Sequence, residues 1–167
     1  VKRIEDFKPD IVAYTAFTNE IKPAAKVAQM LIERERIKPL QVVGGVHVTA
    51  LPEVSLKEFP QFDIVVYGEG EITFLELCQA YVASKTYDHI NGLVFRSSNG
   101  EVVKTAPRER IVDINELPLP AWDLLPPAKH YFIQASRGCP FSCKFCMNPN
   151  GKSVRHRTSE SIIAEIS

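Results

Sequence analysis

Three of the four cysteines in the 167-residue chain lie within eight residues of one another. They are Cys139, Cys143 and Cys146, in the segment RGCPFSCKFCMNP, and their spacing is Cys-x3-Cys-x2-Cys. Thiolates are the soft ligands that hold iron–sulfur clusters and zinc, and such short spacings allow one loop to fold around one inorganic centre. Three thiolates leave one iron of a cubane cluster, or one position of a tetrahedral zinc site, for another ligand. The spacing therefore favours a metal site with an open position.

The residues alone leave three interpretations of this loop open. The cysteines hold a [4Fe-4S] cluster, or they hold zinc with His156 or a water as the fourth ligand, or they are structural thiols without a metal. Near the loop, Arg137, Arg155, His156 and Arg157 form a basic set that either meets a carboxylate or is solvated. The fourth cysteine, Cys78, lies on the apolar helical face of FLELCQAYV and is interpreted as an ordinary core residue.

The segment before this loop predicts strands and helices in alternation. Mostly apolar runs predict strands at residues 10–17, 40–45 and 63–71, and helical periodicity predicts helices at residues 19–36, near 53–59 and at about 72–83. Val1, Ile4 and Phe7 recur at helical spacing before Pro9, so the chain is expected to begin in a helix. Strands of this kind are typically buried on both faces of a parallel sheet. The alternation predicts an α/β fold with a parallel, doubly wound sheet of the Rossmann type.

The loops that follow the three strands carry a second set of candidate binding residues. The carboxyl ends of parallel strands meet at one edge of the sheet, and ligands of such sheets bind there. The candidates in the loops 15–19, 44–49 and 68–71 are Thr15, Thr18, Gly44, Gly45, His47, Gly68, Glu69 and Gly70. Glycines let a backbone approach a ligand closely, but they also make tight turns, and no G-x-G-x-x-G or P-loop spacing is present. His47 alternatively faces solvent, and Glu69 alternatively favours the start of a helix.

The sequence changes in character after Tyr87. Residues 89–107 predict a β-hairpin with Asn-Gly at its turn, and residues 108–130 predict a Pro-rich extended connector held by Trp122 and its leucines. The segment YFIQAS at 131–136 predicts a buried strand that ends at the cysteine loop. These features divide the chain into a Rossmann-type part at 1–88, the hairpin, the connector and a second domain that starts at 131.

Charge and hydropathy exclude several classes of protein. Twenty basic residues balance twenty acidic ones, which argues against a protein held to nucleic acid by phosphate contacts. No segment approaches the roughly 20 apolar residues of a membrane span, and no leader resembles a signal peptide. A cytoplasmic location with reduced thiols is the expectation.

The cysteine pattern also has an aromatic residue, Phe145, directly before its last cysteine, and in this form it resembles the signature of radical S-adenosylmethionine (SAM) enzymes. The segments KPDIV, VVGGVHVT, DIVVYGEGE, INELPLPAWDLL, SRGCPFSCKFC and RHRTSESIIAEI occur in this order over nearly the whole chain. Together they resemble the subclass of radical SAM enzymes that has a cobalamin-binding domain. This subclass includes anaerobic magnesium-protoporphyrin IX monomethyl ester oxidative cyclases and many methyltransferases.

The resemblance implies roles for the candidate residues. Cys139, Cys143 and Cys146 would hold a [4Fe-4S] cluster whose remaining iron is chelated by SAM, and Phe145 would lie near the adenine. Reductive cleavage of SAM would give methionine and a 5'-deoxyadenosyl radical, with a small-molecule substrate and a low-potential electron donor such as flavodoxin or ferredoxin. Cobalamin would lie against the strand-end loops of a flavodoxin-like domain, and the cysteine loop would open a radical SAM (β/α) barrel.

The chain departs from the family pattern in two respects. The Asp-x-His-x3-Gly motif that supplies a histidine to cobalt is absent from residues 1–167. The matching segments resemble the end of the cobalamin domain and the start of the barrel, so the chain is interpreted as an internal fragment, inactive by itself, of a cyclase-like or methyltransferase-like enzyme. The rival hypotheses are a non-catalytic zinc-binding module with a nucleotide-type Rossmann domain, and a cobalamin domain that only binds.

Overall fold

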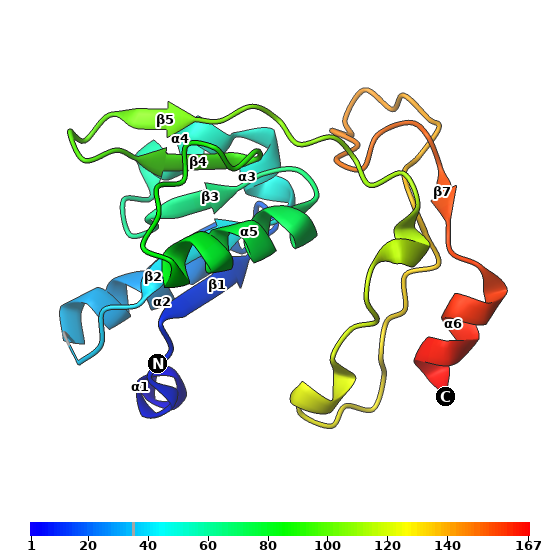
Figure 1. Cartoon of the computed structure of the whole chain (residues 1–167), viewed down its shortest axis with the longest axis horizontal. Coiled ribbons are helices and arrows are strands. Elements are labelled where there is room, and N and C mark those ends of the chain that lie inside the picture. Colours follow the sequence, from blue (N-terminus) through cyan, green and yellow to red (C-terminus); the bar gives the residue numbers. More distant parts are fainter. Residues whose placement is uncertain (35) are drawn as a thin grey trace. The chain divides into compact units, whose positions relative to one another are not determined.

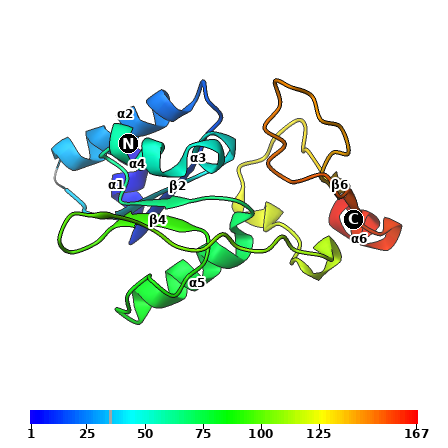
Figure 2. The same ribbon diagram turned by 90° about the horizontal axis from the view of Figure 1, so that it is seen from above.

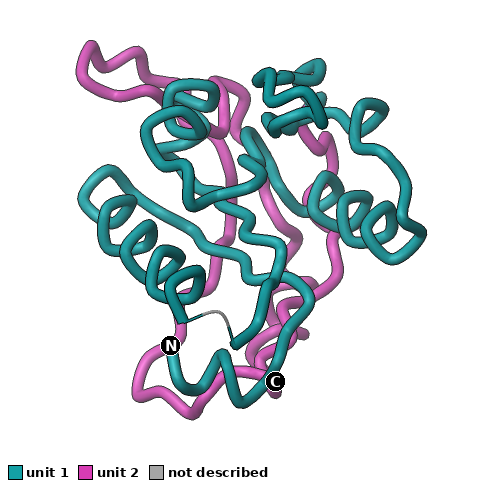
Figure 3. The backbone as a smooth tube through the Cα atoms, turned by 90° about the vertical axis from the view of Figure 1, so that its left-hand side faces the viewer, with its two compact units in different colours: residues 1–109 teal, residues 110–167 magenta. Residues whose placement is uncertain are grey.

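The structure, a computed structural model, describes residues 1–34 and 36–167. The chain divides into two compact units, Val1–Glu109 and Arg110–Ser167, which are coloured separately in Figure 3. The division falls inside the segment that the sequence predicts as a Pro-rich connector. Glu35, in the predicted helix 19–36, lies outside the described residues.

The first unit is built on one five-stranded sheet in the order β1-β2-β3-β4-β5 (Figure 1). Its strands are β1 Ile11–Thr15, β2 Leu40–Gly44, β3 Ile64–Val66, β4 Leu93–Arg96 and β5 Val102–Lys104. The first three are parallel, whereas β4 is antiparallel to β3 and to β5. The predicted parallel sheet followed by a hairpin is confirmed, and the hairpin extends the same sheet.

Helices cover both faces of this sheet (Figure 2). The covering helices are α2 Ile21–Arg34, α3 Val46–Ala50, α4 Pro52–Glu58 and α5 Gly70–Val82, and α1 Lys2–Phe7 precedes β1. Because successive side chains of a strand point to opposite faces, Val43 and Val65 pack with α2, α3 and α4, whereas Val42 and Ile64 pack with α5. The sheet is therefore the middle of three layers, and its buried β-branched strands explain why the apolar runs were recognisable in the sequence.

Strand β1 differs from the expectation of burial on both faces. Ala13 and Thr15 are exposed, since β1 lies at the edge of the sheet with β2 as its neighbour. A tyrosine helps to hold this edge strand in place: the Tyr14 hydroxyl donates a hydrogen bond of 2.9 Å to Oε1 of Gln41 on β2. Burial raises the pKa of Tyr14 from 10.0 to about 12.

We expect Tyr14→Phe to weaken the fold and to change its response to alkali. The folded state favours the neutral phenol, so above pH 10 the unfolded chain loses the Tyr14 proton more readily than the folded one. The stabilisation from Tyr14 is therefore complete below pH 10 and is lost as the pH rises toward 12. The variant loses about 1 kcal/mol at neutral pH, because Gln41 is buried and its Oε1 loses a donor. Urea unfolding between pH 9 and pH 12 should show a shallower decline than in the wild type; parallel curves would contradict this assignment.

The second unit has little regular structure. It contains the 3-10 helices η1 Ile114–Glu116 and η2 Trp122–Leu124, the strands β6 Ser136–Arg137 and β7 Arg155–His156, and the helix α6 Ser159–Ile166. Trp122 packs edge to face on Tyr131, with ring centroids 5.4 Å apart, but Leu124 and Leu125 are exposed, so the leucines do not hold the connector as expected.

The expected buried strand at residues 131–136 is wrong. Tyr131 and Phe132 are exposed, and only Ser136 and Arg137 form a strand, because β7 is its one partner among the described residues and pairs over two positions. Among the helices that the structure describes, none has the length and apolar character needed to span a membrane.

Candidate functional site

The carboxyl ends of β1, β2 and β3 are joined by hydrogen bonds between the loops that follow them. The N–H of Ala16 donates to the carbonyl of Gly44 at 3.1 Å, and the N–H of His47 donates to the carbonyl of Ala16 at 3.2 Å. The third loop joins them because the N–H of Gly68 donates to Thr49 Oγ1 at 3.1 Å. The structure thus brings the strand-end candidates of the sequence to one edge of the sheet.

Two glycines at this edge have different surroundings. Gly45 has φ +101° and ψ −177°, a conformation essentially restricted to glycine, and a Cβ there would lie 2.7 Å from the backbone nitrogen of Ala16. Gly68 has φ +82°, and a Cβ there would meet nothing within 4 Å. Gly45 therefore serves the packing of one loop on another, whereas Gly68 leaves open space. Gly44 and Gly70 have neither a positive φ nor open space around them: an added Cβ would be 3.7 Å and 3.3 Å, respectively, from its nearest neighbour.

His47 is not on a loop, as the sequence suggested, but in helix α3. The helix begins directly after Gly45, whose carbonyl accepts the N–H of Thr49, so the turn that the glycine permits also starts the helix. The imidazole of His47 has its Nδ1 3.3 Å from Thr18 Oγ1 and its ring edge against Phe59. Its side chain is held within the first unit.

The remaining strand-end candidates lie at the same edge. Thr15 and Thr18 are exposed, and Glu69 is the buried N-cap residue of α5. A carboxylate in this place complements the amino end of a helix. The edge therefore offers exposed threonines, open space at Gly68 and main-chain groups to a ligand.

The cysteine loop runs from β6 to β7 in the second unit and is closed at its base. Cys139 donates its N–H to the carbonyl of Gly151 at 2.9 Å. Gly138 has φ +100°, and a Cβ there would overlap the carbonyl oxygen of Ser153. This glycine therefore permits a close approach between the two sides of the loop.

The three cysteines are free thiols, half-buried at Cys139 and exposed at Cys143 and Cys146. Cys143 and Cys146 flank a turn in which the N–H of Cys146 donates to the carbonyl of Cys143 at 3.0 Å. Phe145 lies in this turn and is 93% exposed, so it is not a packed core aromatic. Within the residues that the structure describes, no three His, Cys, Asp or Glu side chains lie close enough together to hold a metal ion.

The loop nevertheless has the donor atoms that an iron–sulfur cluster needs, and its tip is exposed. Three thiols stand on one irregular segment, and two of them are exposed. Residues 140–147, at the tip of the loop, are all exposed, whereas the base of the loop is already hydrogen-bonded. Cys78, by contrast, is half-buried on α5, where burial raises the pKa of its thiol.

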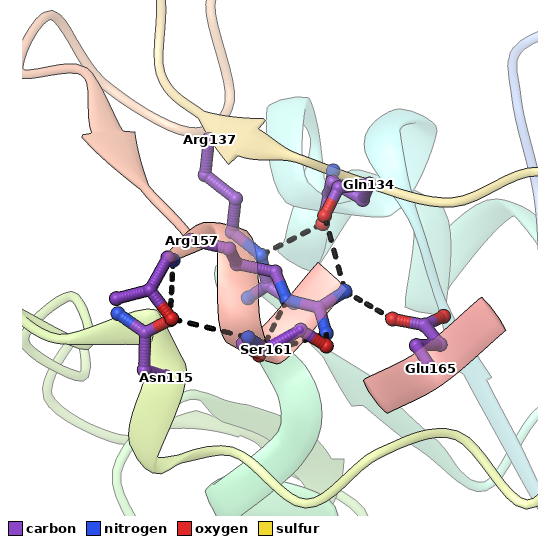
Figure 4. Close-up of polar contacts among 7 residues, drawn as sticks. Asn115, Gln134, Arg137, Arg157, Ser161 and Glu165 are labelled. Atoms are coloured by element: carbon purple, nitrogen blue, oxygen red, sulfur yellow. Dashed lines mark hydrogen bonds and ion pairs between the residues drawn. The ribbon is translucent and has the colours of Figure 1, made fainter. Parts of the chain in front are cut away.

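Two of the basic residues near the loop, Arg137 and Arg157, are held by protein groups (Figure 4). Arg157 donates to Ser161 Oγ at 2.9 Å and forms an ion pair with Glu165, whose side chain is 2% exposed. Arg137 donates from Nε to Gln134 Oε1 at 2.9 Å. Arg157 also donates from Nη1 to the carbonyl of Gln134 at 3.4 Å, so it joins α6 to the segment before β6 and is not a solvated charge.

Two features of the second unit were not recognised in the sequence. One is the Arg157–Glu165 ion pair, which joins residues on separate elements. The other is Asn148, whose Nδ2 donates to the carbonyl of Cys139 at 2.8 Å. Asn-Pro at 148–149 and Asn-Gly at 150–151 are turn signals, and they could have identified this closure.

Comparison with known proteins gives independent matches. Residues 1–78 match the B12 binding domain family. An uncharacterized methyltransferase of Pyrococcus horikoshii is 39% identical over 99% of this chain, and the anaerobic magnesium-protoporphyrin IX monomethyl ester cyclase of Cereibacter sphaeroides is 32% identical over 99%. The chain spans 38% and 29% of the length of these two relatives.

A solved structure has the same fold. It is that of the cobalamin-dependent S-adenosylmethionine radical enzyme OxsB with aqua-cobalamin and S-adenosylmethionine bound, which aligns with a TM-score of 0.75 at 23% identity. The alignment covers 99% of this chain and 24% of OxsB. Both units of the chain therefore have counterparts in that structure.

Proposed function

Since residues 1–78 carry a B12-binding domain and the chain resembles cobalamin-dependent radical SAM enzymes over nearly its whole length, we propose that the intact protein is an enzyme of this kind. The observation that supports this most strongly is the occurrence, on one chain, of a B12-binding domain and the Cys-x3-Cys-x2-Cys loop. The relatives are named as a methyltransferase and a cyclase. Methyl transfer to, or oxidative cyclisation of, a small-molecule substrate is the proposed reaction.

The cysteine loop is the proposed cluster site. In this proposal the thiolates of Cys139, Cys143 and Cys146 hold a [4Fe-4S] cluster, and Phe145, whose ring is exposed, contacts the adenine of SAM. A bound cluster and SAM supply one-electron chemistry that begins a radical reaction. The electron comes from a low-potential donor such as flavodoxin or ferredoxin, in a cytoplasmic setting that keeps thiols reduced.

The strand-end loops of the first unit are the proposed cobalamin site. Thr15 and Thr18 are exposed there, and Gly68 leaves open space beside the main chain. The other proposed contacts are Gly44, Gly45, His47, Glu69 and Gly70. The corrin ring is large and has polar side groups, so it suits an edge with hydrogen-bonding groups and room for close approach.

His47 is not expected to bind cobalt, because the Asp-x-His-x3-Gly motif that supplies a histidine to cobalt is absent from residues 1–167. In the intact protein, His47→Ala should leave the visible absorption spectrum of bound hydroxocobalamin unchanged in peak position. Affinity should fall by less than about 10-fold, the loss expected for one peripheral contact. A shift of the peaks in the variant alone would show that His47 is an axial ligand.

Anaerobic reconstitution of the intact protein tests both halves of the proposal. Treatment with ferrous iron and sulfide should give about four irons per chain and a brown colour. Titration with hydroxocobalamin, followed by visible absorption, should then show saturable binding. One bound zinc without sulfide would favour the zinc-binding module instead, and a protein that ignores cobalamin would leave only the radical SAM half.

A further inference from the structure

The cysteine loop is closed at its base without any cofactor. Beyond the pairing of β6 and β7, Cys139 is hydrogen-bonded through its N–H to Gly151 and through its carbonyl to Asn148. Both main-chain polar groups of the first cysteine are thus occupied by residues that follow the third cysteine. The residues between them, 140–147, form the tip of the loop.

Asn148 contributes to this closure in two ways. Its side-chain amide donates to the carbonyl of Cys139 at 2.8 Å, and its own carbonyl accepts the N–H of Gly151 at 3.1 Å, which closes the turn 148–151. Its backbone has φ +47°, in the left-handed region. Asparagine is one of the few residues other than glycine that adopt this region readily, and it is the one whose amide can also donate.

The turn 148–151 is also held from outside the loop. Arg155 donates from Nη2 to the carbonyl of Asn150 at 3.2 Å and from Nη1 to the carbonyl of Ile111. The guanidinium group of Arg110 lies against Gly151, so closely that a Cβ on that glycine would be 2.7 Å from Arg110 Cζ. Asn148 therefore connects Cys139 to a turn that the rest of the second unit keeps in place.

We propose that Asn148 is a positioning residue for the iron–sulfur cluster, an inference that rests on the proposed function. By fixing the main chain of Cys139 to the turn just after Cys146, it holds the two ends of the ligand loop together before the cluster arrives. Only the tip at 140–147 then has to be ordered on binding, which lowers the entropic cost of assembly. Removal of a residue that orients a metal ligand typically lowers metal affinity by roughly 10- to 100-fold.

Two substitutions separate the hydrogen bond from the backbone conformation. Asn148→Gly keeps access to the left-handed region and removes the amide, whereas Asn148→Asp keeps the shape and replaces the donor with a carboxylate that repels the Cys139 carbonyl. The matched control is Asn150→Asp, the same chemical change two residues away. The structure gives Asn150 a main-chain hydrogen bond from Arg155 and, within the described residues, no side-chain hydrogen bond.

The experiment uses the intact protein, reconstituted anaerobically with ferrous iron and sulfide and then exposed to the iron chelator bathophenanthroline. Both Asn148 variants should lose iron about 10- to 100-fold faster than the wild type, with the Asp variant the faster of the two, and Asn150→Asp should match the wild type. Thermal unfolding by circular dichroism is measured in parallel. A merely structural role would lower the melting temperature together with iron retention, whereas a positioning role changes iron retention alone.

The outcomes distinguish this inference from the proposed function. Wild-type protein that loads about four irons, with Asn148 variants that retain them as well as the wild type, overturns the positioning role and leaves the proposed function standing. Faster iron loss that is equal in Asn148→Asp and Asn150→Asp also overturns it. Wild-type protein that takes up no iron and sulfide overturns both.

Discussion

Replacement of any one of Cys139, Cys143 and Cys146 by alanine is expected to abolish stable cluster assembly in the intact protein. Each thiolate would hold one iron of a cubane, and the remaining iron has no protein ligand in this proposal. A variant therefore has two thiolates for four irons, which is too few to retain the cluster against chelation by buffer or protein thiols. Iron and acid-labile sulfide, measured after anaerobic reconstitution and gel filtration, should fall from about four per chain to near zero.

Cys78→Ala is the matched control for these three variants. Cys78 is half-buried on α5 in the first unit, and burial raises the pKa of its thiol, so less of it is the thiolate that binds metal. Its replacement should leave iron and sulfide at the wild-type level. If all four variants loaded equal amounts of iron, the ligand assignment would be wrong. Loss of a single zinc, rather than of iron and sulfide, would instead identify the loop as a zinc site.

The architecture of the first unit could be predicted because its core strands are locally distinctive. Leu40–Gly44 and Ile64–Val66 are mostly apolar, and a helix follows each of them, so the parallel three-layer arrangement could be inferred from the order of elements. The resemblance to cobalamin-binding radical SAM enzymes is likewise confirmed by the matches. That β4 pairs with β3 depends on contacts between residues distant in sequence, such as Val66 and Leu93, and no local pattern encodes it.

The errors have physical reasons of the same kind. The apolar run at 131–136 looks like a core strand, but a strand needs a partner along its length, and β6 has one over two residues only. His47 looked like a loop residue because the helix α3 is one short turn, too short for periodicity to reveal. The domain boundaries at residues 88, 107 and 130 stay a prediction.

The candidate site was predictable in part. Residues of the strand-end loops could be grouped because parallel strands end at one edge, and cysteines could be grouped by their spacing. The closure of the loop by Asn148 and the Arg157–Glu165 ion pair could not be derived from either rule. Both join side chains to groups whose positions are fixed only by the folded chain. Whether the grouped residues bind the proposed cofactors stays a prediction.

The two glycines with positive φ at the strand-end edge should respond differently to the same substitution. In Gly45→Ala the new methyl group would lie 2.7 Å from the nitrogen and 2.8 Å from the oxygen of Ala16, both main-chain atoms that cannot move without disturbing the loop after β1. Backbone strain of about 1–3 kcal/mol and overpacking of about 1–3 kcal/mol should together lower the free energy of unfolding by roughly 4 kcal/mol. Gly68→Ala carries the strain without the overpacking, because nothing lies within 4 Å of its new methyl group, and should cost roughly 1 kcal/mol.

In the intact protein, the effects of Gly45→Ala and Gly68→Ala on cobalamin affinity should differ in kind from their effects on stability. If the corrin approaches the open space beside Gly68, the methyl group of Gly68→Ala occupies part of the ligand's volume, and we expect about a 10-fold loss of affinity for hydroxocobalamin, equivalent to about 1.4 kcal/mol. Gly45 is proposed to contact the corrin through its main chain, and its new methyl group would face Ala16, so Gly45→Ala should weaken binding only in proportion to the unfolded fraction. Osmolyte that restores folding should therefore restore binding by Gly45→Ala and not by Gly68→Ala. Urea unfolding and spectroscopic titration of the two variants, with and without sucrose, separate these effects. Wild-type affinity in Gly68→Ala would mean that the cobalamin lies elsewhere than at this edge.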